Sequence, residues 1–273
     1  MNPPVALTVA GTDSGGAAGI AADLATFAAL GTHGACAVTA VTAQDTIGVR
    51  AIHPIPPEVV RAQLDAALED LPVGAVKTGM LGTAEAVVSV SEALGPRSDS
   101  RPPLVVDPVL IATSGAVLGD DRVRRAYLDH LLPIATLLTP NLDEARALAA
   151  ETGPPERLAT LLAERGATVV VTGGDPTAAG TCTDWLAHPG ATARPLTHPA
   201  IKTTNDHGTG CTYSAAVTAR LAAGVDLVTA VEQAAAYVAR QLRVSSDWTL
   251  GRGRGPIAHV APTDPMKRTG GEA

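Results

Sequence analysis

Aromatic side chains are scarce in this sequence. Phe, Trp and Tyr make up only 2% of its 273 residues. Proteins that stack nucleic-acid bases need aromatic platforms, so the composition argues against that class of protein. The hydrophobic fraction is nevertheless 46%, which means that a sizeable core must be built from Ala, Val and Leu. A chain of this length can form one large α/β domain or two small ones.

Positive charge is also in short supply. The chain has 20 Lys and Arg against 27 Asp and Glu, which gives a formal net charge of −7. Proteins that bind a phosphate backbone carry basic patches, and this balance argues against them. We therefore expect a small-molecule ligand and no nucleic-acid partner.

Cysteines and long apolar runs are few as well. Cys36, Cys182 and Cys211 are odd in number and show no paired spacing, so neither a disulfide framework nor a zinc site is indicated. The seven histidines show no metal-ligand spacing. The N-terminus has no basic region or cleavage signature, and no apolar run reaches membrane-spanning length. We expect a cytoplasmic protein without a membrane partner.

Short apolar runs and amphipathic segments alternate along the chain. The pattern predicts the following strands: Val5–Ala10, Ala35–Val41, Gly74–Lys77, Leu104–Asp107, Thr136–Thr139 and Thr168–Val171. It predicts helices over residues 19–30, 57–71, 83–94, 121–132, 141–149, 155–165, 211–223 and 227–244. Such alternation favours an α/β fold in which helices cover both faces of a doubly wound, mostly parallel sheet.

One segment departs from this alternation. Residues 175–196 show turns and short polar strands, which predict a small β-hairpin flap beside the main sheet. We expect a single domain over residues 1–262. Residues 263–273 contain Gly and charged residues and are expected to form a disordered tail.

A glycine-containing turn leads directly into the late helix. In residues 203–212, Gly208 and Gly210 let the backbone curl, and the helix that follows leaves its first amides unpaired. Those amides and the helix dipole favour an anion such as a phosphate. Cys211 lies in the first turn, where the same field would lower the pKa of a thiol and make it a plausible base. A turn before a core helix, with Cys211 as a small buried hydrophobe, is the alternative.

Polar residues recur after successive predicted strands. They are Thr12 to Gly16, Gln44 and Asp45, Thr78 to Met80, Asp107, and Asn141 with Glu144. Because ligands bind beyond the carboxyl ends of parallel strands, we expect these residues to surround one site.

Asp107 and Glu144 could hold magnesium and its waters beside nucleotide phosphates, although Glu144 could equally be a helix cap. Asp23 either faces solvent or reaches a ligand amine, and His207 could brace the turn. Met80 and Val109 could be core residues or the wall of a ring-shaped substrate site.

With these residues laid out, the chain resembles the hydroxymethylpyrimidine/phosphomethylpyrimidine kinases of thiamine biosynthesis, in the ribokinase-like superfamily. The resemblance covers nearly the whole chain. It rests on ordered blocks of sequence: residues 10–20 with 22–24, 42–46, 76–81, 106–109, 139–145 and 207–212. Ala21, inside the first block, departs from the family, which frequently has Gln there.

The resemblance implies ATP-dependent phosphorylation of 4-amino-5-hydroxymethyl-2-methylpyrimidine and then of its monophosphate. It also implies roles for individual residues. Those that would surround the pyrimidine are Gly11, Asp23, Gln44, Met80, Val109 and Cys211. The catalytic anion hole would be Gly208, Thr209, Gly210 and Cys211. Asn141, Thr172, Gly173, Gly174 and Thr209 would hold nucleotide, and Asp107 and Glu144 would hold Mg²⁺. A homodimer is implied, and the use of a monovalent cation is left open.

Two departures from the family pattern matter. Thr172 stands where the family commonly has Lys, so a cation expected beside the ATP phosphates is missing. Asp206 adds negative charge directly before the turn and would repel phosphate unless it points away or attends a metal ion. Two alternatives therefore stay open: a pyridoxal-type vitamin kinase, and a pyrimidine-binding protein that has lost catalysis.

Overall fold

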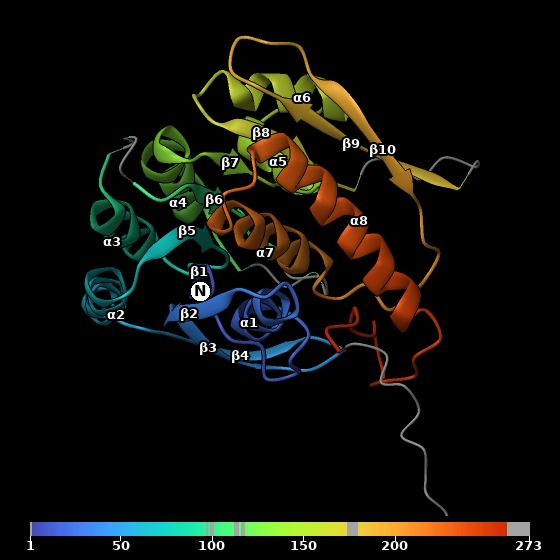
Figure 1. The fold of residues 1–273 in the computed structure, drawn as a ribbon, viewed down its shortest axis with the longest axis horizontal. Coiled ribbons are helices and arrows are strands. Elements are labelled where there is room, and N and C mark those ends of the chain that lie inside the picture. The colour runs from blue at the N-terminus through green and yellow to red at the C-terminus, as the bar shows by residue number, and fades with distance from the viewer. Residues whose placement is uncertain are drawn as a thin grey trace, which may run out of the picture.

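A single eight-stranded sheet forms the centre of the computed structural model (Figure 1). The structure describes residues 2–96, 98, 101–111, 115, 118–173 and 180–260. The strands lie in the order β10-β9-β8-β7-β6-β5-β1-β2. Six strands of this sheet run parallel to one another: β1 (Val5–Ala10), β2 (His33–Val38), β5 (Val73–Thr78), β6 (Leu104–Val106), β7 (Leu137–Leu138) and β8 (Thr168–Val171). The predicted parallel sheet is confirmed.

The predicted hairpin is present, but it is part of the main sheet. β9 (Thr181–Ala187) and β10 (Arg194–Pro199) pair antiparallel with each other, and β9 pairs antiparallel with β8. A second hairpin, which the sequence did not predict, forms a separate two-stranded sheet from β3 (Ala40–Gln44) and β4 (Val49–Pro54). The predicted strand Ala35–Val41 is in fact the end of β2 and the start of β3.

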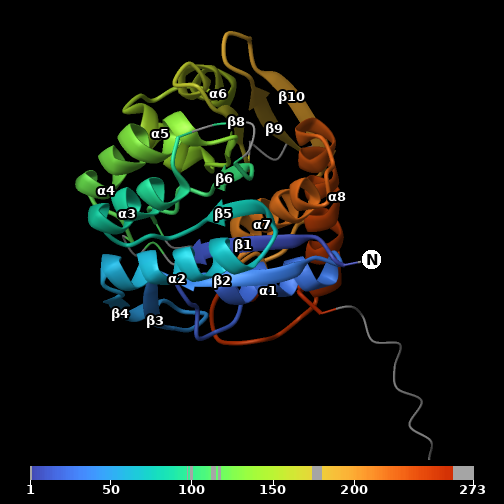
Figure 2. The ribbon, with the colours of Figure 1, turned by 60° about the vertical axis from the view of Figure 1, so that its left-hand side comes forward.

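Helices cover both faces of the sheet (Figure 2). One face packs against α1 (Gly19–Ala29), α7 (Thr209–Ala222) and α8 (Leu227–Ser245). The other packs against α2 (Pro57–Asp70), α3 (Ala84–Leu94), α4 (Asp121–Ala126), α5 (Leu142–Ala149) and α6 (Pro155–Ala163). The inner strands β1, β6, β7 and β8 are buried along their whole length, which explains their mostly apolar sequences, whereas the edge strands β2 and β10 are partly exposed.

The helix predicted over residues 121–132 is irregular at its end. α4 passes into a π-helical turn at Tyr127–Leu131 and a 3₁₀ turn at Leu132–Ile134. Pro133 has no amide proton and so cannot continue the regular hydrogen bonding.

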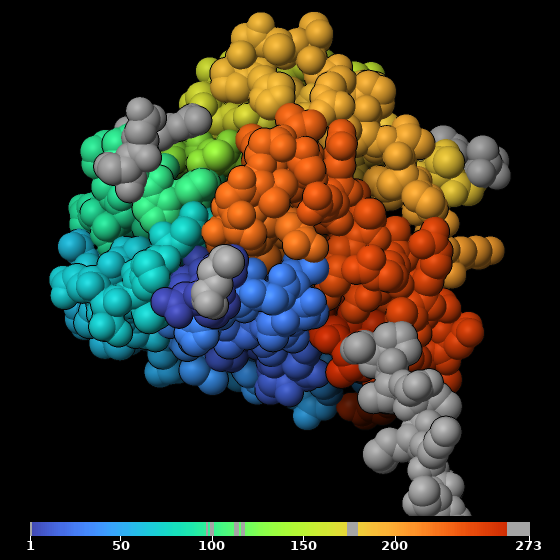
Figure 3. All heavy atoms as spheres, in the orientation of Figure 1, coloured from blue at the N-terminus to red at the C-terminus, as the bar shows by residue number. Residues whose placement is uncertain are grey.

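The C-terminal segment crosses back to the N-terminal half of the chain (Figure 3). Residues 249–260 form no helix or strand, and we call them the C-terminal strap. The Thr46 hydroxyl accepts hydrogen bonds from the amides of Arg252 (3.0 Å) and Gly253 (3.1 Å). The expected tail, residues 263–273, lies outside the described residues, and the single domain over 1–262 stays a prediction.

Candidate active site

The carboxyl ends of the parallel strands open into one cavity of about 820 Å³, its mouth included. The loops after β1, β5, β6, β7 and β8 all contribute to its wall, as expected for an open parallel sheet. The predicted residues among its lining are Gly11, Gln44, Met80, Asp107, Val109, Asn141, Glu144, Thr172, Gly208, Gly210 and Cys211. These residues therefore line one space, and their functional roles stay predictions. We call this space the first cavity.

The glycine turn begins α7 at the edge of this cavity. Gly208 has a φ of +87°, and a Cβ there would lie 1.8 Å from the carbonyl oxygen of Ala17, so only glycine fits. The first bond of the helix runs from the Thr212 amide to the Gly208 carbonyl (2.9 Å). The amides of Gly210 and Cys211 precede that bond and have no acceptor among the described residues. They are free to bind an anion.

His207 braces the turn, as the sequence suggested. Its Nε2 lies 3.2 Å from Asp13 Oδ2 and 3.1 Å from Gln44 Nε2. Asp13 also accepts hydrogen bonds from the amides of Gly15 (2.8 Å) and Ala18 (2.9 Å). Burial opposes the charge of Asp13, but these bonds hold its pKa below the usual value. The loop after β1 and the turn before α7 are thus joined by a buried carboxylate.

A fully buried lysine organises the charges beneath the cavity. Lys77 Nζ lies 2.7 and 2.9 Å from the two carboxylate oxygens of Asp23 and 3.8 Å from Asp107 Oδ2. Thr8 donates to Asp23 (2.6 Å), and Ser214 donates to Asp107 (2.9 Å). Burial alone would lower the pKa of Lys77, but Asp23 raises it, followed by Cys211 and Asp107. Lys77 is therefore a permanent cation at this site.

Asp23 was expected to face solvent or reach a ligand. Neither arrangement is seen: the residue is fully buried, its oxygens are held by Lys77 and Thr8, and it does not line the cavities in the described part of the chain. Its charge is needed to balance Lys77, which explains a carboxylate inside an apolar helix.

Cys211 is a partly buried residue that lines the first cavity. The expectation that the helix end lowers its pKa is wrong for the structure as it stands. Burial raises the pKa of the Cys211 thiol to about 12, and Asp107 and Asp23 add to this effect. Lys77 and the Gly19 amide favour the thiolate but are outweighed. The thiol is therefore neutral near pH 7.

Asp107 and Glu144 are both almost fully buried at the floor of the cavity. Glu144 is a helix cap, since its Oε2 accepts from the Asn141 amide while Asn141 Oδ1 accepts from the Glu144 amide, each at 2.9 Å. Burial and the charge of Asp107 raise the pKa of Glu144 to about 8. Two neighbouring carboxylates in a buried site favour a divalent cation with hard oxygen ligands.

A second cavity adjoins the first. The two share Asn141, Thr172 and Gly210 in their walls. The second cavity also contains Gly173 and Thr209, and its apolar wall comes from α7 and α8: Tyr213, Ala235, Val238, Ala239 and Leu242. An apolar slot that opens onto unpaired amides suits a nucleotide, whose base is flat and whose phosphates are charged. Gly174 lies outside the described residues.

The negative charge of Asp206, which was expected to repel phosphate, is neutralised by an ion pair. Arg254, in the C-terminal strap, donates from its guanidinium to both carboxylate oxygens of Asp206, with an Nε–Oδ1 distance of 2.8 Å. No local pattern predicts a pair between two residues that are 48 positions apart. Lys77 was missed too, although a lysine inside the otherwise apolar strand β5 is a usable signal.

Comparison with known proteins agrees with this geometry. The family model described as phosphomethylpyrimidine kinase matches residues 13–258. The chain belongs to the phosphomethylpyrimidine kinase family. Among its relatives, the hydroxymethylpyrimidine/phosphomethylpyrimidine kinase of Synechococcus elongatus is 43% identical over 96% of this chain and 99% of the relative. The protein of that name from Rhizobium meliloti is 45% identical over 93% and 96%. The predicted family and kinase class are confirmed.

The ribokinase-like fold is confirmed as well. The structure of Bacillus subtilis pyridoxal kinase in complex with ADP superposes with a TM-score of 0.85 at 32% identity, over 94% of this chain and 98% of that one. Within the described part of the chain, no helix combines the length and apolar character needed to span a bilayer.

Proposed function

We propose that this member of the family transfers phosphate from ATP to the hydroxyl group of 4-amino-5-hydroxymethyl-2-methylpyrimidine, and then phosphorylates the monophosphate. The observation that carries the proposal is the meeting of two cavities at the start of α7, where the amides of Gly210 and Cys211 have no acceptor within the described part of the chain. Phosphoryl transfer needs both reactants aligned and the migrating charge neutralised, and this arrangement supports both.

The first cavity would hold the pyrimidine. Gly11, Met80 and Val109 supply close or apolar walls, and a Cβ at Gly11 would lie 2.4 Å from Met80 Cε. Gln44 supplies an amide that can recognise a ring nitrogen or an amino group. Asp23, although matched to the family's pyrimidine residues, would act through Lys77, because its oxygens are already occupied. The second cavity would hold ATP, with its phosphates near Asn141, Thr172, Gly173 and Thr209.

Cys211 would receive or relay the proton of the substrate hydroxyl. Its thiol is neutral before catalysis, so proton removal requires the balance of nearby charges to change. Asp107 raises the pKa of this thiol, and a cation held there would reduce that effect. Lys77 already favours the thiolate from below.

The oxygen donors fit Mg²⁺. Asp107 and Glu144 would hold it, directly or through water. The raised pKa of Glu144 reflects its burial first and then the like charge of Asp107, which a cation would relieve. When bound, Mg²⁺ neutralises phosphate charge during transfer.

A pyridoxal-type kinase is the second candidate, favoured by the close structural similarity to Bacillus subtilis pyridoxal kinase. A pyridine that bears a hydroxymethyl group has much the same size and shape as the pyrimidine. We expect kcat/KM for the aminopyrimidine alcohol and its monophosphate to exceed that for pyridoxal. Higher turnover of pyridoxal would reverse the order. ATP-dependent product from either substrate would exclude a binding protein without catalysis.

We also propose that the protein is a homodimer and is located in the cytoplasm. Val41, Ile47 and Ile52 of the β3–β4 hairpin expose large apolar side chains, which supports contact with a second copy. Light scattering after gel filtration tests this: a mass equal to one chain, about 27.5 kDa, at micromolar concentration would contradict it.

A further inference from the structure

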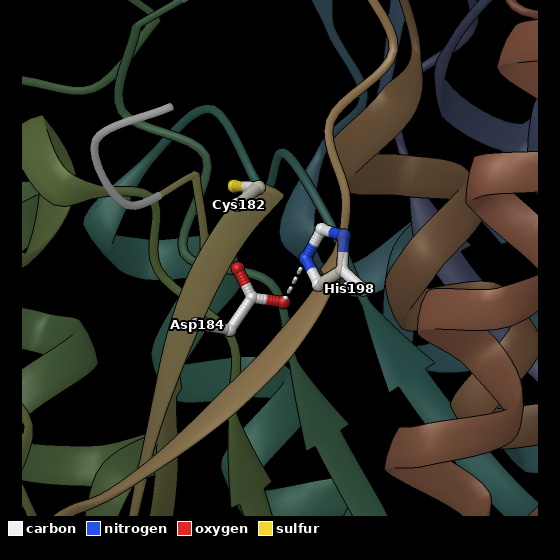
Figure 4. A group of neighbouring side chains, drawn as sticks. All are labelled: Cys182, Asp184 and His198. Carbon is white, nitrogen blue, oxygen red and sulfur yellow. Dashed lines mark hydrogen bonds and ion pairs between the residues drawn. The ribbon is translucent and has the colours of Figure 1, made fainter. Parts of the chain in front are cut away.

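Three potential metal ligands meet on one face of the β9–β10 hairpin (Figure 4). Cys182 and Asp184 are two residues apart on β9, so their side chains project to the same side of the sheet. On β10, His198 lies directly opposite Cys182 in the antiparallel register. The pairing of these two strands alone therefore brings a thiol, a carboxylate and an imidazole together.

The three donor atoms are close enough to serve one ion. A sulfur, a carboxylate oxygen and a ring nitrogen all lie within 4.8 Å of one another. The contact from His198 Nε2 to Asp184 Oδ2 is 3.1 Å. Ligands at zinc bond lengths of about 2.0–2.3 Å stand about 3.3–3.8 Å apart in a tetrahedron, so only a small closure of the cluster is needed.

The surroundings hold the carboxylate in place and leave the cluster accessible. Asp184 is only 3% exposed, and its other oxygen accepts a hydrogen bond from the Gly173 amide at 3.0 Å. Such bonds orient ligating carboxylates in metal sites. All three side chains line the second cavity, which provides an entry path for an ion.

We propose that Cys182, Asp184 and His198 form a zinc-binding site in the wall of the second cavity. Sulfur and imidazole nitrogen favour Zn²⁺ over Mg²⁺, which prefers oxygen ligands. Three protein ligands leave the fourth position for water, as in zinc sites that remain open. The site is distinct from Asp107 and Glu144, whose donors are oxygens only. The spacing of cysteines and histidines along the sequence indicated no zinc site. It could not reveal one, because His198 reaches Cys182 only through the pairing of β10 with β9.

The test is zinc binding by the full chain, measured apart from kinase activity. The protein is stripped with a chelator and titrated with ZnCl₂ against a chromophoric competitor, and its zinc content is then measured after gel filtration. We expect one Zn²⁺ per chain, bound at least tenfold more weakly by Cys182→Ser and by His198→Asn. The matched controls are Cys36→Ser, which removes an exposed thiol on β2, and His188→Asn. Both should bind zinc as the unaltered chain does.

Cobalt provides a second measurement, which reports directly whether a thiolate binds the metal and does not depend on the affinity. Co²⁺ bound to a thiolate gives a near-ultraviolet charge-transfer absorption, which should be lost in Cys182→Ser and kept in Cys36→Ser. Circular dichroism of the stripped variants checks that they fold. Undiminished zinc or cobalt binding in Cys182→Ser, or an equal loss in Cys36→Ser, would overturn the proposal and leave the three side chains as an ion pair of the hairpin.

Discussion

At the scale of single residues, Lys77 connects stability with chemistry. Its ammonium group neutralises Asp23, lies 3.8 Å from Asp107 and favours ionisation of Cys211. A buried charge that loses its partner keeps its desolvation cost without compensation. The same residue therefore holds the sheet to α1 and sets the charge beneath the proposed phosphoryl site.

Lys77→Met should lower the free energy of unfolding by about 3–5 kcal/mol, because it leaves the Asp23 carboxylate buried and unpaired. Urea denaturation measures the change. Lys202→Met, at an exposed lysine, is the matched control and should change stability by less than about 0.5 kcal/mol. A loss below about 1 kcal/mol for Lys77→Met would contradict the role given to this pair.

Thr172 tests the nucleotide site. It lies in the wall shared by the two cavities, and among the described residues its hydroxyl has one contact, with the Pro140 carbonyl at 3.5 Å. Thr172→Lys should add a charge-assisted bond to a phosphate and lower KM for ATP about tenfold. Thr192→Lys adds the same charge at an exposed position on neither cavity. An unchanged KM in Thr172→Lys, or an equal decrease in Thr192→Lys, would count against nucleotide phosphates at Thr172.

At the scale of elements, the start of α7 is held by the C-terminal strap. The His207 amide donates to the Gly255 carbonyl, and the Ile257 amide donates to the His207 carbonyl, each at 3.0 Å. His259 Nε2 lies 2.8 Å from the Thr212 hydroxyl in the first turn of the helix. The geometry of the anion site thus depends on a segment far away in sequence.

Acid should weaken this attachment through His259. Burial, with a smaller effect of His207, lowers the pKa of His259 from 6.5 to about 4. Between these values the unfolded chain binds more protons than the folded one, so stability falls as pH drops through this window. The free energy of unfolding should therefore be lower at about pH 5 than at about pH 7.5, and His259→Gln should reduce that difference by up to about 2 kcal/mol. The exposed His53→Gln should leave that difference intact, and denaturation curves at both pH values decide.

Elements with a strong local signal were predictable from sequence. Thr83 caps α3 through a 3.1 Å bond to the Ala86 amide, and Asn141 caps α5. The β3–β4 hairpin was missed because the apolar run from Ala35 to Val41 hides a change of sheet. At Thr39 the amide bonds to Ala10, while the carbonyl accepts from Ile55. These are tertiary contacts without a local signature.

At the scale of the whole molecule, the cavities are formed by segments from both ends of the chain. Strand ends could be grouped from sequence because parallel strands share an edge. Three features could not be predicted from sequence: the pairing of Asp206 with Arg254, the burial of Asp23 beside Lys77, and the cluster at His198. Each brings together segments that are far apart in the sequence, and no local pattern reports that proximity. The pKa of Cys211 is raised and not lowered as expected, because the thiol is buried. Its position at the start of a helix did not reveal that burial.

Deletion of residues 249–273 tests the strap as a whole. It removes buried Ile257 and Ala258 together with the bonds to residues 204–207, and should lower the free energy of unfolding by about 2–4 kcal/mol and abolish turnover. Deletion of residues 263–273 alone, the tail expected from sequence, is the control and should change neither property. Equal behaviour of the two truncations would contradict the bracing role of the strap.

The most direct measurement of the central claim is mass spectrometry of the products formed from Mg-ATP and 4-amino-5-hydroxymethyl-2-methylpyrimidine, with the unaltered chain and with Cys211→Ala. The account predicts the monophosphate followed by the diphosphate for the unaltered chain. It predicts a rate at least about 100-fold lower for the variant, the effect of losing a general base. Absence of phosphorylated product from the folded chain, or equal rates for the two proteins, would contradict phosphoryl transfer at the start of α7 with Cys211 as its proton acceptor.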